Sequence, residues 1–309
     1  MDGIVKTVKA GLISSDSFES LVERFLSYEE VAESSKYTYR RQLRQFRNFV
    51  EGRSELSSQT IIEYKKHLLD VRKLTPLTVS GYLTAVRKFF AFLEAEKIYP
   101  NIVTVKSPKK PKGFRKDCLS KNQIRTSLDN IRTDDLKGLR DFALFNLLVR
   151  TGLRTIEAVR ATVGDIRQES GQAVLWIQGK GRNEKDDFVI LTAKTINPIQ
   201  DYLELREKTE KLSDDSPLFA SDSNRNLGEP LTTRSVSRII KEALRTAGNN
   251  SKRLSAHSLR HTAITLSIVG GATLQQAQAM ARHADPKTTM VYLHNLNRVQ
   301  AGAEKFIDF

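Results

Sequence analysis

The first third of the chain carries hydrophobic residues at the spacing of amphipathic helices. Two successive repeats are Phe18, Leu21, Val22, Phe25 and Leu26, then Leu43, Phe46, Phe49 and Val50. Apolar residues three and four positions apart form one buried face of a helix. A third helix is expected to begin after Ser57 or Ser58, and a fourth has Thr75 as N-cap and Pro76 in its first turn. The pattern from about residue 18 to residue 98 predicts a compact helical bundle.

The pattern changes in the second part of the chain. Ser120 and Gln123 have the spacing of a capping box, and a strongly apolar helix at about 139–149 is ended by Gly152. The hydrophobic period then becomes two residues, which is typical of strands. Strands are expected at 173–178 and 187–191, joined by the hairpin connection 179–185, and helices at 192–206, 232–247 and 258–269.

Helix signals also divide the C-terminal segment. Thr273 with Gln276 forms a second capping box, and Asp285 with Pro286 begins a short helix that carries Tyr292. Beyond it, residues 299–309 mix apolar and charged side chains. We expect this tail to pack either on its own domain or on a neighbouring subunit.

The clearest domain boundary is the stretch 106–116, which has prolines, six Lys or Arg residues and no acidic residue. Prolines favour extended backbone, and cations along an extended backbone can follow a row of phosphates. We therefore divide the chain into a helical domain at 1–105, a basic linker at 106–116 and a second domain at 117–309 that ends in a tail, 295–309.

Composition narrows the choice of partner and compartment. Fifty Lys and Arg residues against 36 Asp and Glu give a net charge of +14, which favours nucleic acid or an anionic membrane surface. No apolar run approaches the roughly 20 residues that cross a bilayer, and the N-terminus lacks a signal-peptide pattern. The single cysteine, Cys118, excludes an internal disulfide and a cysteine-based zinc site. We expect a protein of the cytoplasm with no membrane partner.

Basic side chains gather on two of the expected N-terminal helices and in the linker. Such clusters are either solvated helix faces or contacts to DNA phosphates. The candidates for DNA contact are Arg40, Arg41, Arg44, Arg87, Lys88, Lys109, Lys110 and Lys112.

His257, Arg260 and His261 stand at positions i, i+3 and i+4, so a helix projects them on one side. The two histidines have a spacing found in metal sites. However, the glutamate of the HExxH motif is absent, and Arg260 would repel a cation. The spacing does not decide whether His261 takes part in chemistry, supports a neighbour or packs in the core.

Arg154, Lys180, His257, Arg260, His283 and Tyr292 follow one another in an order that resembles the tyrosine recombinase or phage integrase family, including its Xer-like members. The surrounding residues match as well: Thr-Gly-Leu precedes Arg154, Glu157 follows three residues later, glycines flank Lys180, and nine residues separate His283 from Tyr292. The resemblance implies a mainly α fold. It consists of an N-terminal helical bundle, the SAM-like core-binding domain, and a mostly helical catalytic domain with a small antiparallel β-sheet.

The chemistry of a phosphodiester explains this set of residues. Arg154 and Arg260 would clamp the anionic oxygens, because guanidinium groups keep their charge. Tyr292 is the expected nucleophile. Since the ordinary pKa of a tyrosine is about 10, it needs a proton acceptor, for which the resemblance also implies His257. Lys180 would protonate the departing 5′ oxygen, and His283 would hydrogen-bond a phosphate oxygen.

The expected product is a 3′-phosphotyrosyl bond, formed without a metal or another cofactor because side chains supply the cations. The leading interpretation is a site-specific recombinase that acts as a homotetramer on two double-stranded DNA sites. A type IB topoisomerase and a non-catalytic DNA-binding protein are the alternatives. Phage integration, transposon resolution and chromosome dimer resolution are equally compatible with the motifs, which do not specify the DNA target or accessory proteins.

Overall fold

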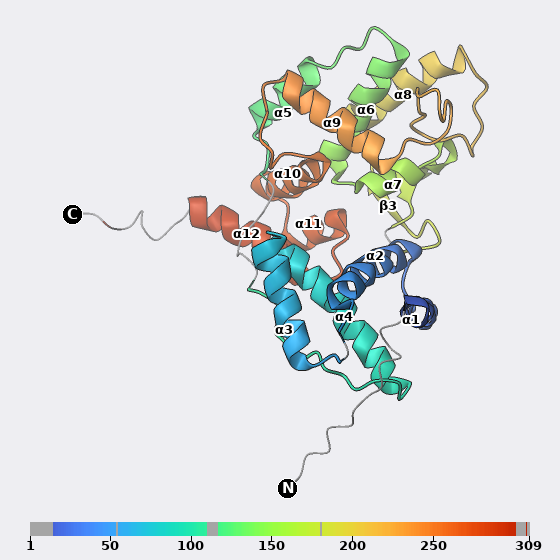
Figure 1. The fold of residues 1–309 in the computed structure, drawn as a ribbon. Helices are drawn as coiled ribbons and strands as arrows, with labels where there is room; N and C mark the ends of the chain where they lie inside the picture. The colour runs from blue at the N-terminus through green and yellow to red at the C-terminus, as the bar shows by residue number, and fades with distance from the viewer. Residues whose placement is uncertain (1–14, 54, 110–116, 180, 301–306, 308–309) are drawn as a thin grey trace. The chain divides into compact units, whose positions relative to one another are not determined.

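The computed structural model describes residues 15–53, 55–109, 117–179, 181–300 and 307. The chain divides into two compact units, residues 1–113 and 114–309, each with its own hydrophobic core (Figure 1). In the described part of the chain, no helix is both long and apolar enough to cross a bilayer.

The first unit is a helical bundle, as its hydrophobic spacing predicts. Its helices are α1 (Ser15–Tyr28), α2 (Glu33–Val50), α3 (Ser58–Lys66), the π-helical turn η2 (His67–Val71) and α4 (Pro76–Ala95). Ser57 and Thr75 are the N-caps of α3 and α4, as expected. Aromatic rings fill the core, with the centroid of Phe46 5.1 Å from that of Tyr64 and 5.9 Å from that of Phe90. Edge-on contacts of this kind stabilise a core beyond the area that they bury.

The second unit is mostly helical and contains one small sheet. Its helices are α5 (Lys121–Asp129), α6 (Leu136–Thr151), α7 (Thr155–Arg160), the 3-10 turn η3 (Val163–Asp165), α8 (Ala193–Glu207), α9 (Thr233–Thr246), α10 (Ala256–Val269), α11 (Leu274–Ala281) and α12 (Pro286–Gln300). The capping boxes at Ser120 and Thr273 form as predicted. This architecture confirms the mainly α fold class.

The described strands form a three-stranded antiparallel sheet in the order β1 (Ile166–Glu169), β2 (Gln172–Ile177) and β3 (Asp187–Ile190). The sequence predicted β2 and β3 but not β1. In the register of the sheet, Leu175 of β2 faces Ile166 on one side and Val189 on the other. The sheet therefore contributes its central strand to the core of the second unit.

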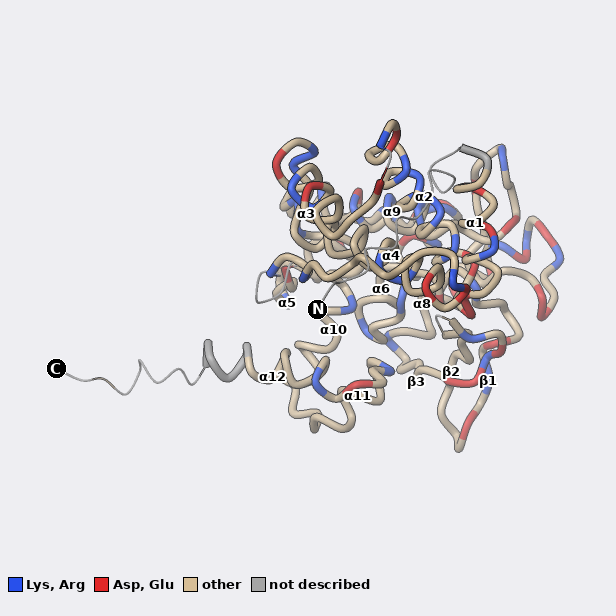
Figure 2. Tube along the Cα trace, turned by 60° about the horizontal axis from the view of Figure 1, so that its bottom comes forward, with Lys and Arg blue, Asp and Glu red and all other residues tan. Residues whose placement is uncertain are grey.

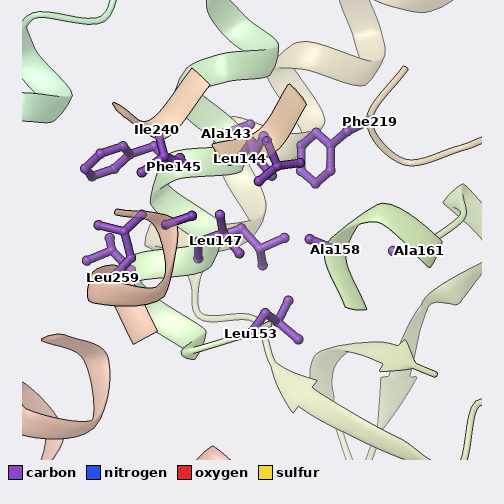
Figure 3. Packing of buried hydrophobic residues seen from close by; sticks show 14 of the residues in the cluster. Ala143, Leu144, Phe145, Leu147, Leu153, Ala158, Ala161, Phe219, Ile240 and Leu259 are labelled. Atoms are coloured by element: carbon purple, nitrogen blue, oxygen red, sulfur yellow. The ribbon is translucent and has the colours of Figure 1, made fainter. Parts of the chain in front are cut away.

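Helix α6 is the centre of that core, packed against α8 and α10. Figure 3 shows its side chains Leu144 and Leu147 among residues from α7, α9 and α10, with Leu259 of α10 and Ala158 of α7 labelled. The segments that carry the predicted site residues, around Leu153 and Leu259, thus belong to one packed body.

The expected length of the helix that carries Tyr292 is wrong, and the expected linker stays a prediction. The helix that carries Tyr292 is not short: α12 has 15 residues and continues into the region 295–309 that we expected to be a tail. The linker prediction for 106–116 falls largely on residues outside those described. Figure 2 shows acidic residues interspersed with the basic ones along much of the described chain.

Candidate active site

Arg154 stands at the junction of α6 and α7. It is the N-cap residue of α7, and its backbone N–H donates to Glu157 Oε2 at 2.7 Å. Its guanidinium also donates to Glu157 Oε1 at 2.8 Å. Glu157 is fully buried, and its carboxylate holds both the backbone of the turn and the guanidinium of Arg154 in place. The i, i+3 spacing of Arg154 and Glu157 in the sequence is thus the spacing of a direct ion pair.

Gly152 connects the Arg154 turn to the histidine-arginine segment. It ends α6 with a φ of 65°, in the left-handed region that favours glycine. A Cβ there would lie 3.4 Å from the Cβ of Ala263 and 3.9 Å from the Cγ of Arg260. Its carbonyl oxygen accepts a hydrogen bond of 2.5 Å from Arg260. The close approach of α10 therefore brings Arg260 to the same end of α6 as Arg154.

Arg260 is 97% buried, since only 3% of its surface is exposed. Its guanidinium donates to the carbonyl oxygens of Gly152 and Ala281, which fix its plane between α6 and α11. Burial, together with the neighbouring guanidinium groups of Arg154 and Arg282, lowers the pKa of Arg260 to about 10. Arg260 still carries its charge at neutral pH, in a place where positive charges repel one another.

The two histidines of α10 have different surroundings. His257 is exposed, whereas His261 is half-buried, and their ring centroids are 4.6 Å apart. His261 Nδ1 makes a short hydrogen bond with the hydroxyl of Tyr292. Burial, and then the charge of a protonated His257, lower the pKa of His261 to about 4. His261 is therefore neutral near pH 7, and its tautomer decides which of the two groups donates in this hydrogen bond.

Tyr292 lies inside the second unit, with 3% of its surface exposed. It packs in a small apolar cluster with Ile264 and Ala281. Burial raises its pKa to about 12, although the charge of Arg260 acts in the opposite direction. In this position the phenol is protonated at neutral pH.

His283 is a second histidine beside the ring of Tyr292. Its ring is stacked on that of Tyr292 with 6.3 Å between centroids, and its Nδ1 is 2.9 Å from Thr289 Oγ1. Burial lowers its pKa to about 4, and the charges of Arg260, Arg154 and Arg282 add to this effect. The nine-residue step in the sequence thus places His283 and Tyr292 side by side.

Arg282 is a site residue that sequence reasoning missed. It donates to Glu157 Oε2 at 2.7 Å, so Glu157 binds two arginines from distant parts of the chain. The only signal in the sequence was its place next to His283. Arg282 and His283 also line a cavity of about 360 Å³, together with residues of α11 and β3.

Lys180 lies outside the described residues, so its assignment stays a prediction. At the far end of the same hairpin connection, Lys185 pairs with Asp165 at 2.6 Å. In the part of the chain that the structure describes, no group of three or more His, Cys, Asp or Glu side chains is placed to hold a metal ion.

The candidate DNA contacts of the first unit have unequal surroundings. Arg40 forms a two-pronged pair with Glu23 at 2.7 and 2.6 Å, and Lys88 pairs with Glu29 at 2.5 Å. Other members of the set are Arg87, which donates to the Val105 carbonyl at 3.2 Å, and the exposed Arg41, Arg44 and Lys109. Lys110 and Lys112 lie outside the described residues.

Comparison with known proteins identifies the family of the chain. Residues 117–298 match the phage integrase family, and the tyrosine recombinase XerC of Halalkalibacterium halodurans is 33% identical over 286 residues, 88% of this chain and 92% of the relative. The chain belongs to the phage integrase family. Another relative of this integrase-family chain, the tyrosine recombinase XerD of Listeria monocytogenes, is 27% identical to it. The match covers 89% of this chain and 90% of the relative.

Solved structures share the fold of this family member. The XerH site-specific recombinase, in a post-cleavage complex with a palindromic difH substrate, has a TM-score of 0.73 at 22% identity, over 94% of this chain and 85% of its own. A lambda integrase dimer bound to a COC′ core site has a TM-score of 0.66 at 14% identity, over 87% and 96% of the two chains. At these identities the likeness concerns the fold.

Proposed function

We propose that this chain is a site-specific recombinase that cuts and rejoins DNA strands, with Tyr292 as the nucleophile and a 3′-phosphotyrosyl bond as the intermediate. One observation carries the proposal: the hydroxyl of Tyr292 lies against His261, its ring stacks on His283, and the guanidinium of Arg260 is close enough to lower its pKa. A tyrosine packed only for stability does not need buried cations around it.

In the proposed reaction, the Tyr292 oxygen attacks the phosphorus and the bond from phosphorus to the 5′ oxygen breaks. Arg154 and Arg260 bind the non-bridging oxygens and balance the charge that builds up on them. Lys180 gives a proton to the departing 5′ oxygen, which would otherwise leave as an alkoxide. A 5′ hydroxyl from another strand can reverse these steps, because the phosphotyrosyl ester keeps the energy of the broken bond.

The proton of Tyr292 has to leave during the attack. His261 is a poor final acceptor, because its pKa of about 4 lies far below the pKa of about 12 of the phenol. We assign acceptance to His257, which is exposed and can face bound DNA. Tyr292, at 3% exposure, has to leave its buried position to reach a phosphate, so DNA binding and a shift of α12 are coupled in this proposal.

The finer assignments follow from the same chemistry. Exchange of strands between two DNA sites needs four cleavages, so a homotetramer on double-stranded DNA is the proposed assembly, with no cofactor. Relatives named XerC and XerD support a Xer-like role in recombination between specific sites. The cytoplasm is the proposed compartment.

A nicked suicide substrate tests this function directly. It traps the covalent complex, because the short strand beyond the cut diffuses away and religation stops. Wild-type protein is expected to give a denaturant-resistant DNA adduct. Tyr292→Phe is expected to bind the same DNA and give none, since it lacks only the attacking oxygen. An adduct with Tyr292→Phe would refute the assignment, and tight binding by wild type without an adduct would favour a DNA-binding protein.

A further inference from the structure

We propose that Arg282 is a third arginine of the active site, a positioning residue that balances the buried carboxylate of Glu157 and so leaves the charge of Arg154 available to the DNA phosphate. This inference rests on the proposed strand-transfer function. Arg282 directly precedes His283, yet its side chain turns to Glu157, 125 positions earlier in the sequence.

The contacts of Glu157 show why a second cation is needed there. A fully buried carboxylate paired with one arginine would form a neutral pair, and the guanidinium of Arg154 would have its charge compensated by the protein. Arg282 supplies the second guanidinium at 2.7 Å. Burial alone would raise the pKa of Glu157, but the charge of Arg282 and the hydrogen bonds from Arg154 outweigh it and hold the pKa below its ordinary value.

The charge balance of the cluster supports this role. Arg154, Arg260 and Arg282 surround a single carboxylate, so the cluster keeps two net positive charges. Attack on a phosphodiester by a tyrosinate gives a transition state with two negative charges on the non-bridging oxygens. Without Arg282 the net charge of the cluster would fall to one, which no longer matches that transition state.

The backbone conformation of Arg282 is one that costs free energy for a residue with a side chain. Its φ is 51°, a left-handed conformation that costs free energy for any residue with a Cβ and that glycine adopts readily. One guanidinium nitrogen donates to the Met280 carbonyl at 2.8 Å, which ties the side chain to the end of α11. Arg282 therefore has a strained backbone conformation at a position where glycine would cost less free energy.

The Arg282 guanidinium is enclosed by the protein. The side chain of Arg282 is 8% exposed, and its buried Nε has no hydrogen-bond partner among the residues that the structure describes. Buried N–H groups are nearly always satisfied, by protein, water or a ligand. Arg282 and His283 line the same cavity, and the charge of Arg282 contributes to the lowered pKa values of His283 and Arg260. Because this Nε is shielded from solvent, Arg282 is placed to act through Glu157 and Arg154 and not by direct contact with DNA.

Four variants separate positioning from simple structural support: Arg282→Gly, Arg282→Ala, Arg282→Lys and, as control, Arg132→Ala. Arg282→Gly removes the charge and also relieves the left-handed backbone, so its fold should be kept, while Arg282→Ala keeps the backbone strain. Arg282→Lys restores the charge without the fork. Arg132 is an exposed arginine of the same unit that pairs with Asp134, so Arg132→Ala removes one charge outside the site.

The measurement is the rate of adduct formation on the nicked substrate at saturating DNA. We expect Arg282→Gly and Arg282→Ala to be slower by about tenfold to a hundredfold, the effect of misplacing a group that contacts the substrate. Arg282→Lys should recover part of the rate, and Arg132→Ala should match wild type. In the DNA-free protein, NMR titration should find the pKa of His283 higher in Arg282→Gly, because one of the cations that depress it is gone.

The results distinguish failure of the Arg282 inference from failure of the proposed function. A folded Arg282→Gly protein that forms the adduct at the wild-type rate overturns the inference. A slow Arg282→Gly protein with an unchanged His283 pKa and no gain on restoring the charge with lysine also overturns it, because it indicates a structural role alone. If wild type itself forms no adduct, the proposed function fails, and the variants are not needed to show it.

Discussion

His257 and His261 lie one helical turn apart, and their surroundings give them different chemistry. His261 is half-buried against the Tyr292 hydroxyl, while His257 is exposed. The spacing predicted that both lie on one side of α10, but it could not predict which one contacts the tyrosine. That choice depends on how α12 packs, which no local pattern encodes. For the same reason the Arg154–Glu157 support was predictable at i, i+3, and the Arg282–Glu157 pair was not.

The depressed histidine pKa values predict a pH dependence of stability. His261 and His283 have pKa values of about 4 in the folded state against an ordinary value of 6.5, so between these pH values the unfolded chain binds more protons. The free energy of unfolding should therefore rise from pH 4 to pH 6.5 and level off above it, with up to about one proton per histidine. Chemical denaturation across this range measures the slope.

His261→Gln isolates one of the two contributions. Glutamine keeps an acceptor for the Tyr292 hydroxyl but does not titrate, so the slope should fall by up to about one proton. A slope equal to that of wild type would show that His261 is not the neutral, half-buried partner of the Tyr292 hydroxyl described above.

At the scale of elements, the ends of helices were more predictable than the sheet. Ser57, Thr75 and Ser120 cap helices as expected, because a capping side chain acts within one turn of its own position. Strand β1 was missed because its four residues are mostly polar and owe their conformation to pairing with β2. Capping residues act within one helical turn, so the sequence predicts them. Strand pairing depends on which segments the fold brings together, so it is visible only in the structure.

The turn that joins α6 to α7 should be sensitive to a single methyl group. Gly152→Ala is expected to lower the free energy of unfolding by about 1–2 kcal/mol through its left-handed φ alone, because the added Cβ would meet Ala263 at an ordinary van der Waals distance of 3.4 Å. Gly171→Ala is the matched control, since its φ is 77° and nothing lies within 4 Å of an added Cβ. Similar losses in urea denaturation are expected for the two variants, and a much larger loss for Gly152→Ala would show that α10 packs more tightly against this turn than the 3.4 Å distance indicates.

At the scale of the whole molecule, the net charge of +14 indicates a polyanionic partner but does not show which cations bind it. Arg40 is already balanced by Glu23, whereas Arg41 and Arg44 are exposed on the same helix. The sequence could identify the basic clusters and the family motifs. It could not show which cations are neutralised within the protein, because the pairing acids lie far away in the chain.

DNA binding at several salt concentrations tests this distinction. Arg41→Ala and Arg44→Ala should each reduce the slope of log affinity against log salt by up to about one, the loss of one phosphate contact. Arg40→Ala should reduce it less, because Glu23 already compensates that charge. The opposite ranking would show that the Glu23 pair opens on DNA and that Arg40 is the principal contact.

The central claim is that Tyr292 becomes joined to the 3′ end of a cut DNA strand. Trypsin releases residues 288–298, a peptide in which Tyr292 is the one tyrosine. Mass spectrometry of the trapped complex, after nuclease digestion, should find this peptide with a nucleotide mass on Tyr292. A nucleotide mass on any other peptide, or on none while the DNA is cut, would contradict the account.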